Sequence, residues 1–334
     1  MRICVVGAGA IGGLLGVKLA LAGEDVTLIA RGPNLAAIRQ NGMRLIGEGG
    51  SETLVRVKVT DKIGEAGEQD LVILGMKAHQ VAAVVKDLPA LYHSETMVMT
   101  AQNGIPWWYF FKHGGELEGR RLESVDPGGV IAAHLPVARV IGVVVYPAAE
   151  LRAPGVLRHI EGNRFSVGEI DNSETPRIRR VSETLRNAGF KAPILTDIRS
   201  EIWLKLWGNL SFNPISALTH ATLVDICQFP QTRELAAKMM IEAQDIAEKL
   251  GIQFRVSLEK RIAGAQAVGK HKTSMLQDIE AGRALEIHAL VGAVVEVGKI
   301  TGTPTPHIDA VYACVSLLAK TLQEEKGKLK IQPL

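Results

Sequence analysis

The start of the chain places a glycine-rich turn between an apolar run and a helical pattern. Residues 3–6 are apolar and mostly β-branched, as in a buried parallel strand, and residues 14–21 have the pattern of a helix. Between them lie Gly7, Ala8, Gly9, Ala10, Ile11 and Gly12. The first glycine permits a tight turn, the second lets the backbone approach a pyrophosphate, and the third lets the helix pack on the strand. Because the helix start also offers N–H groups to phosphates, this segment predicts a dinucleotide-binding site.

The residue after the second predicted strand indicates which dinucleotide is bound. Residues 26–30 form that strand, which ends at Arg31. An acidic residue about 20 residues beyond the glycines would bind the ribose 2′-hydroxyl of NAD. Arg31 instead supplies a planar donor fork suited to the 2′-phosphate of NADP, and residues 30–34 contain no acid. A solvated surface arginine is the alternative, but the pattern favours NADP(H) as the cofactor.

Strands continue to alternate with helices in the first half of the chain. Residues 55–59, 71–74, 96–100 and 142–146 predict strands, and residues 80–88 predict a helix. This alternation predicts an α/β fold with a Rossmann-type, doubly wound parallel sheet. Ligands of such sheets gather at the carboxyl ends of the strands. Lys77 and Gln80 follow one such end and Asn103 another, so we expect them to face the cofactor.

Later segments show where the first domain ends. Residues 156–160 and 164–167 predict a pair of strands that could form a hairpin, and residues 176–188 a helix ended by Gly189. Long helical patterns replace strands around residues 191–197. We therefore predict an NADP-binding Rossmann-like domain over residues 1–192 and an all-α substrate and catalytic domain over residues 193–334.

The first long helix of the second domain carries three polar side chains on one side. Lys205, Asn209 and Asn213 are spaced four residues apart in an apolar setting, and Pro214 is expected to kink or end the helix. A second helical segment, residues 273–280, leads toward Glu286 on another helix. A lysine beside a carboxylate suits carbonyl reduction, because the developing alkoxide needs a proton and a nearby positive charge. The alternatives are a lysine that reaches to solvent and a solvated glutamate.

Composition excludes several classes of protein. The chain has 334 residues, of which 47% are hydrophobic and 22% charged, which is typical of a globular protein with sizeable cores. Its net charge of +3 is too small to indicate a nucleic-acid partner. Three separated cysteines lack metal-ligand spacing, so no metal site is predicted and a reducing cytoplasm is expected. No targeting segment or membrane helix is predicted.

The end of the chain leaves the oligomeric state open. Residues 307–324 predict an amphipathic helix that packs on its own domain or on a second subunit, so a homodimer is one expectation. Residues 325–334 are expected to be loosely ordered.

An ordered series of motifs over nearly the whole chain resembles the ketopantoate reductase (2-dehydropantoate 2-reductase) family. The motifs are the glycine series 7–12, Lys77-Ala78 with Gln80, Asn103-Gly104, Glu-Ile-Trp-Leu-Lys-Leu at 201–206, Asn209, Asn213-Pro214, Ser-Met-Leu-Gln-Asp at 274–278, and Glu286-Ile287. The resemblance implies NADPH-driven reduction of 2-dehydropantoate to pantoate, a step toward pantothenate.

The resemblance also implies a role for each matching residue. Lys205 matches the proton donor, and Glu286 matches a residue near the cofactor ribose and that lysine. Asn209, Asn213 and Ser274 match residues that hold the substrate, and Asn103 one near both nicotinamide and substrate. The remaining cofactor contacts implied are the glycine series, Arg31, Lys77, Gln80 and a backbone contact at Ala148.

The chain departs from the family pattern at four positions. His288 and Val291 follow Glu286 where the family commonly has aspartate and asparagine, and His271 and Leu223 stand where asparagines can occur. One added or lost polar contact can change the preference between related substrates. A reductase of another branched or bulkier 2-oxo acid is therefore an alternative. A non-enzymatic NADP sensor is a third, which would bind the cofactor without turnover.

Overall fold

The computed structural model describes residues 1–325 and divides them into two compact units. The first unit comprises Met1–Arg121 and Asp126–Ile198, and the second comprises Leu122–Val125 and the chain from Arg199 onward. The boundary after Ile198 lies six residues beyond the predicted one at 192. The short segment 122–125 groups with the second unit, which the sequence did not indicate. The predicted loose tail lies, except for its first residue, outside the described residues.

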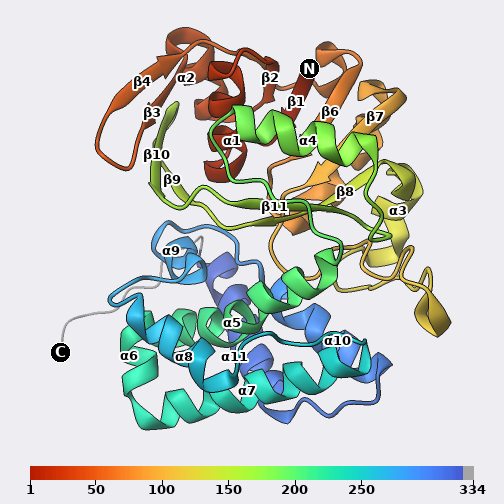
Figure 1. Cartoon of the computed structure of the whole chain (residues 1–334). Coiled ribbons are helices and arrows are strands. Elements are labelled where there is room, and N and C mark those ends of the chain that lie inside the picture. The colour runs from red at the N-terminus through yellow and green to blue at the C-terminus, as the bar shows by residue number, and fades with distance from the viewer. Residues whose placement is uncertain (326–334) are drawn as a thin grey trace. The chain divides into compact units, whose positions relative to one another are not determined.

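A seven-stranded sheet forms the centre of the first unit (Figure 1). Its strand order is β11-β8-β7-β6-β1-β2-β5, and every neighbouring pair is parallel except β11 with β8. The six parallel strands follow the 3-2-1-4-5-6 order of a dinucleotide-binding fold, so the predicted doubly wound sheet is confirmed. The strands are β1 (Arg2–Val6), β2 (Asp25–Ile29), β5 (Lys58–Thr60), β6 (Gln69–Leu74), β7 (Tyr92–Thr100), β8 (Val140–Val145) and β11 (Phe165–Glu169).

A second sheet covers the other side of the first helix, α1 (Ala10–Leu21). It has the order β4-β3-β10-β9, formed by Glu52–Val55, Met43–Ile46, Val156–Glu161 and Ala148–Ala153 respectively. α1 contacts β1 and β2 of the large sheet and all four strands of the small one. Because α1 is packed on both sides, its Leu14, Leu15 and Leu19 are fully buried.

The structure corrects three of the predicted elements in this unit. Residues 55–59 are not one strand: β4 ends at Val55 in the small sheet and β5 begins at Lys58 in the large one. Residues 156–160 and 164–167 do not form a hairpin, because β10 pairs with β9 and β3 while β11 pairs with β8. The predicted helix at 80–88 is two 3₁₀ segments, Ala78–Ala83 and Val85–Leu91, the second containing Pro89.

Other helices of the first unit surround the sheets. α2 (Gly32–Asn41) follows β2, and a short α3 (Val130–His134) precedes β8. α4 (Pro176–Asn187) contacts β11 and α1, and it matches the helix predicted for 176–188. Thr175 begins α4 by accepting a hydrogen bond from the backbone N–H of Ile178, and Pro176 occupies the first turn, where its missing N–H costs nothing.

The described part of the second unit is helical, as predicted (Figure 1). α5 (Ile198–Thr219) runs through Pro214, so of the two predicted effects, a kink or an end of the helix, the end does not occur. Residues 210–217 are all buried, and this packing supports the helix past the proline. The following helices are α6 (Leu223–Gln228), α7 (Pro230–Lys249), α8 (Leu258–Ala267), α9 (Ser274–Glu280), α10 (Ala293–Ile300) and α11 (Pro306–Glu324). α11 packs on α7. Within residues 1–325, none of the helices is long and apolar enough to span a membrane.

Candidate functional site

The glycine series forms the turn between β1 and α1 that the sequence predicted. Gly7 has a positive φ of 103°, which favours glycine. A Cβ on Gly12 would lie 2.0 Å from the carbonyl oxygen of Gly7, so the turn closes only because residue 12 has no side chain. A Cβ on Gly9 would meet nothing within 4 Å. Gly9 is also the N-cap of α1, without a capping side chain, so the N–H groups there remain available to an anion. These features fit a bound pyrophosphate.

Asn34 holds this turn in place, and the sequence interpretation did not identify it. Its Nδ2 donates a 2.8 Å hydrogen bond to the carbonyl oxygen of Ala8, and its Oδ1 accepts one of 2.8 Å from the N–H of Gly155. Asn34 therefore connects the glycine turn to the loop between β9 and β10. The only local signal is an amide side chain directly after Pro33 at the start of α2.

Arg31 lies at the carboxyl end of β2, next to the glycine turn. It is exposed and is the N-cap of α2. The backbone N–H groups of Gly7 and Ala8 both donate to the carbonyl oxygen of Ile29, two residues before Arg31. Arg31 is thus an exposed residue at the strand end adjacent to the turn, where a 2′-phosphate contact was predicted.

The loops after β6 and β7 leave the same edge of the sheet as the glycine turn, because Val6, Leu74 and Thr100 are in register. A Cβ on Gly75 would lie 2.6 Å from the Cα of Gly12, so the loop before Lys77 touches the turn. Lys77 and Asn103 are half-buried on these two loops.

Two glutamines of these loops have structural contacts. The Oε1 of Gln80 accepts from the backbone N–H of Lys77 at 3.1 Å, which begins the 3₁₀ segment 78–83. Gln102 donates to the carbonyl oxygens of Leu74 and Met76 at 2.7 and 3.2 Å, which joins the ends of β6 and β7. Ala148, the last predicted cofactor contact of this unit, is half-buried at the start of β9.

Lys205 lies half-buried on α5 in the second unit. Burial lowers the pKa of its ammonium group from 10.5 to about 8, and the negative charge of Glu286 opposes this shift. Glu286 itself is half-buried and lies just before a helical stretch rather than within a helix, which corrects the prediction. A lysine with a pKa near neutrality and a carboxylate acting on it are suited to proton transfer.

The other polar residues of α5 continue the line from Lys205. Asn209 is half-buried and Asn213 is 5% exposed, each one helical turn further along the unbroken helix. The Nδ2 of Asn213 donates to the Oγ of Ser274 at 3.3 Å. Ser274 is the first residue of α9, which Thr273 begins by accepting from the N–H of Leu276. The structure therefore brings Asn213 and Ser274 together from separate helices.

The departures from the family pattern have different surroundings. Leu223 donates its backbone N–H to the carbonyl oxygen of His271 at 3.0 Å, so these two positions are neighbours. Val291 is fully buried. His288 is exposed, and its Nδ1 shares a 3.0 Å hydrogen bond with the hydroxyl of Tyr312.

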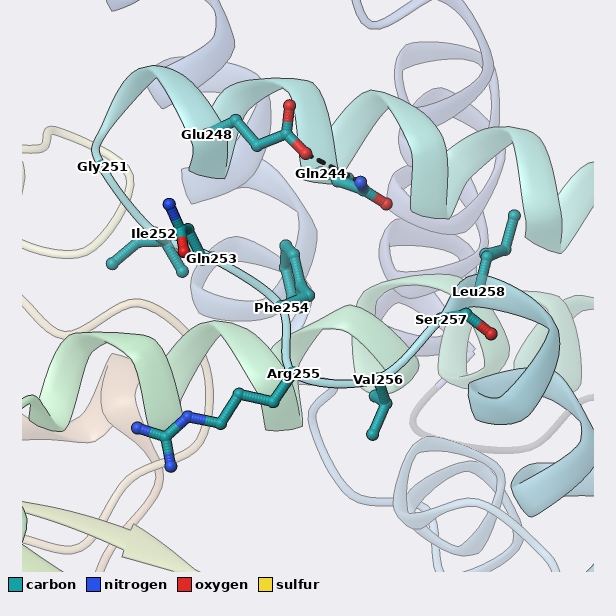
Figure 2. Close-up of a pocket in the computed structure, with 10 residues that line it drawn as sticks. All are labelled: Gln244, Glu248, Gly251, Ile252, Gln253, Phe254, Arg255, Val256, Ser257 and Leu258. Atoms are coloured by element: carbon teal, nitrogen blue, oxygen red, sulfur yellow. Dashed lines mark hydrogen bonds between the residues drawn. The ribbon is translucent and has the colours of Figure 1, made fainter.

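Figure 2 shows a surface hollow of the second unit. It is lined by Gln244 and Glu248 of α7, which share a hydrogen bond of 2.8 Å, and by residues 251–258. Phe254 of this loop stacks on Trp207 of α5 at 4.2 Å between ring centroids. None of the predicted site residues lines the hollow, so it is a feature of the packing around α5 and not the predicted site.

Comparisons with known proteins cover both units. The family model described as "Ketopantoate reductase PanE/ApbA" matches residues 3–172, and the one described as its C-terminal part matches residues 197–319. A 2-dehydropantoate 2-reductase from Mesorhizobium japonicum is 53% identical over 320 residues, covering 96% of this chain and 98% of that protein.

Solved structures agree with these matches. A crystal structure from Ralstonia solanacearum MolK2 is 41% identical, covers 96% of this chain and 98% of its own, and superposes with a TM-score of 0.92. A ternary complex of D-mandelate dehydrogenase with NADH and anilino(oxo)acetate shares the fold, with a TM-score of 0.83, 22% identity, and coverage of 97% of this chain and 99% of its own.

Proposed function

Because the chain belongs to the ketopantoate reductase family, we propose that it catalyses the NADPH-dependent reduction of 2-dehydropantoate to (R)-pantoate in pantothenate biosynthesis. One structural observation, in addition to family membership, supports this reaction. Lys205, whose pKa is lowered to about 8, stands on the same helix as Asn209 and Asn213, and Asn213 is hydrogen-bonded to Ser274. The second unit thus offers a proton donor in line with neutral hydrogen-bonding groups, as reduction of a 2-oxo acid requires.

In this proposal NADPH binds mainly through residues of the first unit. The glycine turn and the start of α1 bind the pyrophosphate, and Arg31 binds the 2′-phosphate that distinguishes NADPH from NADH. Lys77, Gln80, Asn103 and the backbone of Ala148 provide further contacts, and Glu286 binds the ribose. When bound, the reduced nicotinamide supplies the hydride that the substrate carbonyl carbon accepts.

The residues of the second unit supply the proton and the orientation. Asn209, Asn213 and Ser274 hold the hydroxyl, carbonyl and carboxylate groups of the substrate, and Asn103 is proposed as a further substrate contact. As the C=O double bond becomes a C–O single bond, the oxygen gains negative charge and takes a proton from Nζ of Lys205. Lys205 is left neutral and regains a proton from solvent. Glu286 favours the charged form of Lys205 before the step.

A second candidate function is reduction of another branched or bulkier 2-oxo acid by the same residues. His271 and Leu223 favour it, because they are hydrogen-bonded neighbours and both replace amide side chains that the family pattern can have. Losing an amide from a substrate pocket and adding an aliphatic side chain favours a larger, less polar substrate.

A panel of 2-oxo acids tests the proposal. NADPH oxidation should be measured at several concentrations of 2-dehydropantoate, 2-oxoisovalerate, 2-oxoisocaproate and phenylpyruvate. We expect the highest kcat/KM for 2-dehydropantoate. A kcat/KM at least tenfold higher for another member would favour the second function, and cofactor binding without turnover of any member would contradict both.

A further inference from the structure

The residues after Glu286 form an unusual turn. His288–Gly292 is a π-helix, and the regular α10 follows it from Ala293. Such a single π-helical turn, called the π-turn below, contains an extra residue relative to an α-helix and is rare, so we expect other contacts to hold it. Removing that extra residue would rotate whatever precedes the turn by roughly 100° about the helix axis. The direction of Glu286 relative to α10 therefore depends on this turn.

Tyr312 of α11 contacts both ends of the π-turn. At one end, its hydroxyl shares the 3.0 Å hydrogen bond with Nδ1 of His288. At the other end, a Cβ on Gly292 would lie 2.7 Å from the hydroxyl oxygen and 3.0 Å from Cζ of the same ring. A side chain at residue 292 would therefore force the Tyr312 ring or the turn to shift.

α10, which follows the π-turn, and α11, which carries Tyr312, are each held by a buried or half-buried carboxylate. Glu242 of α7 accepts from the backbone N–H groups of His307 and Ile308 at 2.9 and 3.0 Å, which holds the start of α11. Glu296 of α10 accepts from the backbone N–H groups of Glu123 and Ser124 at 2.8 and 2.9 Å. Tyr312 is thus a fixed support, and the turn between Glu286 and α10 is shaped against it.

We propose that Tyr312 and Gly292 are positioning residues that hold the π-turn and thereby direct the carboxylate of Glu286 toward Lys205. Neither residue is assigned to substrate or cofactor; both act through Glu286. The inference rests on the proposed function, because it assumes that Lys205 is the proton donor. Three charged side chains lie near these residues. The charge of Glu286 acts on Lys205, the charge of Glu296 acts on Tyr312, and Arg261 packs over Gly208 of α5.

The test is the pH dependence of kcat in two variants. Gly292→Ala places a methyl group against the Tyr312 ring and should displace the turn. Tyr312→Phe keeps the ring but removes the bond to His288. Because the charge of Glu286 raises the pKa of Lys205, displacing it should move the alkaline limb of kcat to lower pH by roughly one unit. We expect the full shift of the alkaline limb in Gly292→Ala and a smaller shift in Tyr312→Phe. If Gly292→Ala does not fold, Tyr312→Phe alone provides the test.

Gly298→Ala is the matched control. Gly298 lies in the same helical stretch, and a Cβ there would also be crowded, at 3.0 Å from Cγ2 of Thr305. This variant should lower the thermal midpoint without moving the alkaline limb. Glu286→Gln should shift the limb as Gly292→Ala does, and the double variant should shift it no further.

The outcomes separate the inference from the proposed function. If the limb stays at its wild-type pH in Gly292→Ala and Tyr312→Phe while Lys205→Ala is inactive, the positioning role is wrong and the proton donor stands. If the control Gly298→Ala shifts the limb equally, the effect is a general loss of packing and the positioning role is again wrong. Wild-type kcat in Lys205→Ala would contradict both the proposed function and the inference.

Discussion

Asn213 of α5 and Ser274 of α9 are joined by a hydrogen bond of 3.3 Å from Nδ2 to Oγ. The two residues are 61 positions apart in the sequence, and Asn213 is almost fully buried. A buried amide seldom remains without partners, and this one donates to the hydroxyl of Ser274, the first residue of α9. The bond therefore joins two of the four residues that we propose to hold the 2-oxo acid.

Removing either member of this pair should weaken substrate binding. We expect Asn213→Ala and Ser274→Ala each to raise KM for the 2-oxo acid roughly tenfold, as loss of one hydrogen bond of about 1.4 kcal/mol implies, with KM for NADPH unchanged. Steady-state kinetics with each substrate varied would measure this. Ser211→Ala is the control, because Ser211 is buried on the same helix but bonded to the carbonyl of Trp207. Equal effects of all three variants would argue for a general disturbance of α5.

The lowered pKa of Lys205 predicts how activity depends on pH. The protonated lysine is the donor, so kcat should fall as pH rises through about 8, the pKa of Lys205. One unit above the pKa only roughly a tenth of the enzyme would carry the proton. The measurement is kcat between pH 6 and 10 at saturating NADPH and 2-oxo acid. A kcat that is constant up to pH 10 would be inconsistent with this donor.

Gly9 and Gly12 should respond differently to the same substitution. A methyl group on Gly9 meets no protein atom within 4 Å, so Gly9→Ala should fold normally but occupy space needed by the pyrophosphate, raising KM for NADPH. A methyl group on Gly12 would collide with the carbonyl of Gly7, so Gly12→Ala should lose about 1–3 kcal/mol of stability. Thermal unfolding and NADPH titration of both variants would show this. An unchanged NADPH affinity in Gly9→Ala would remove the turn as the phosphate site.

Arg31 should decide the preference between the two cofactors. A charge-assisted hydrogen bond contributes about 1.5–3 kcal/mol, so Arg31→Asp should reduce the preference for NADPH over NADH by roughly 10- to 100-fold. The ratio of kcat/KM values for the two cofactors measures this directly. Arg39→Asp, at an exposed arginine further along α2, makes the same change of charge away from the strand end and should leave the ratio unchanged. Equal ratios in the two variants would contradict a direct contact.

The local sequence pattern was sufficient to predict those elements whose structure is determined by residues close together in the chain. The β1 strand, the glycine turn and α1 follow one another within about twenty residues, and each is specified by its own composition. Pairing of strands is not local. Val55 and Val59 alternate as in one strand, yet they belong to different sheets, because β4 must pair with β3 and β5 with β2. Nothing between residues 55 and 59 distinguishes this from a continuous strand.

The same distinction applies to the candidate site. The spacing of Lys205, Asn209 and Asn213 could be recognised because all three lie on one helix. The bond from Asn213 to Ser274, the support that Asn34 gives to the glycine turn, and the contact of Tyr312 with the π-turn all join distant residues. Helical periodicity also could not predict the π-turn, since the residues involved fit an ordinary helix equally well.

The kcat of Lys205→Ala, measured beside its affinity for NADPH, tests the central claim most directly. Loss of a general acid should lower kcat by about 10²–10⁴-fold, while NADPH, proposed to bind mainly through the first unit, should keep its wild-type dissociation constant. Lys205→Arg, which keeps the charge but releases its proton far less readily, should also be strongly impaired. A kcat within a few-fold of wild type in Lys205→Ala would contradict the account.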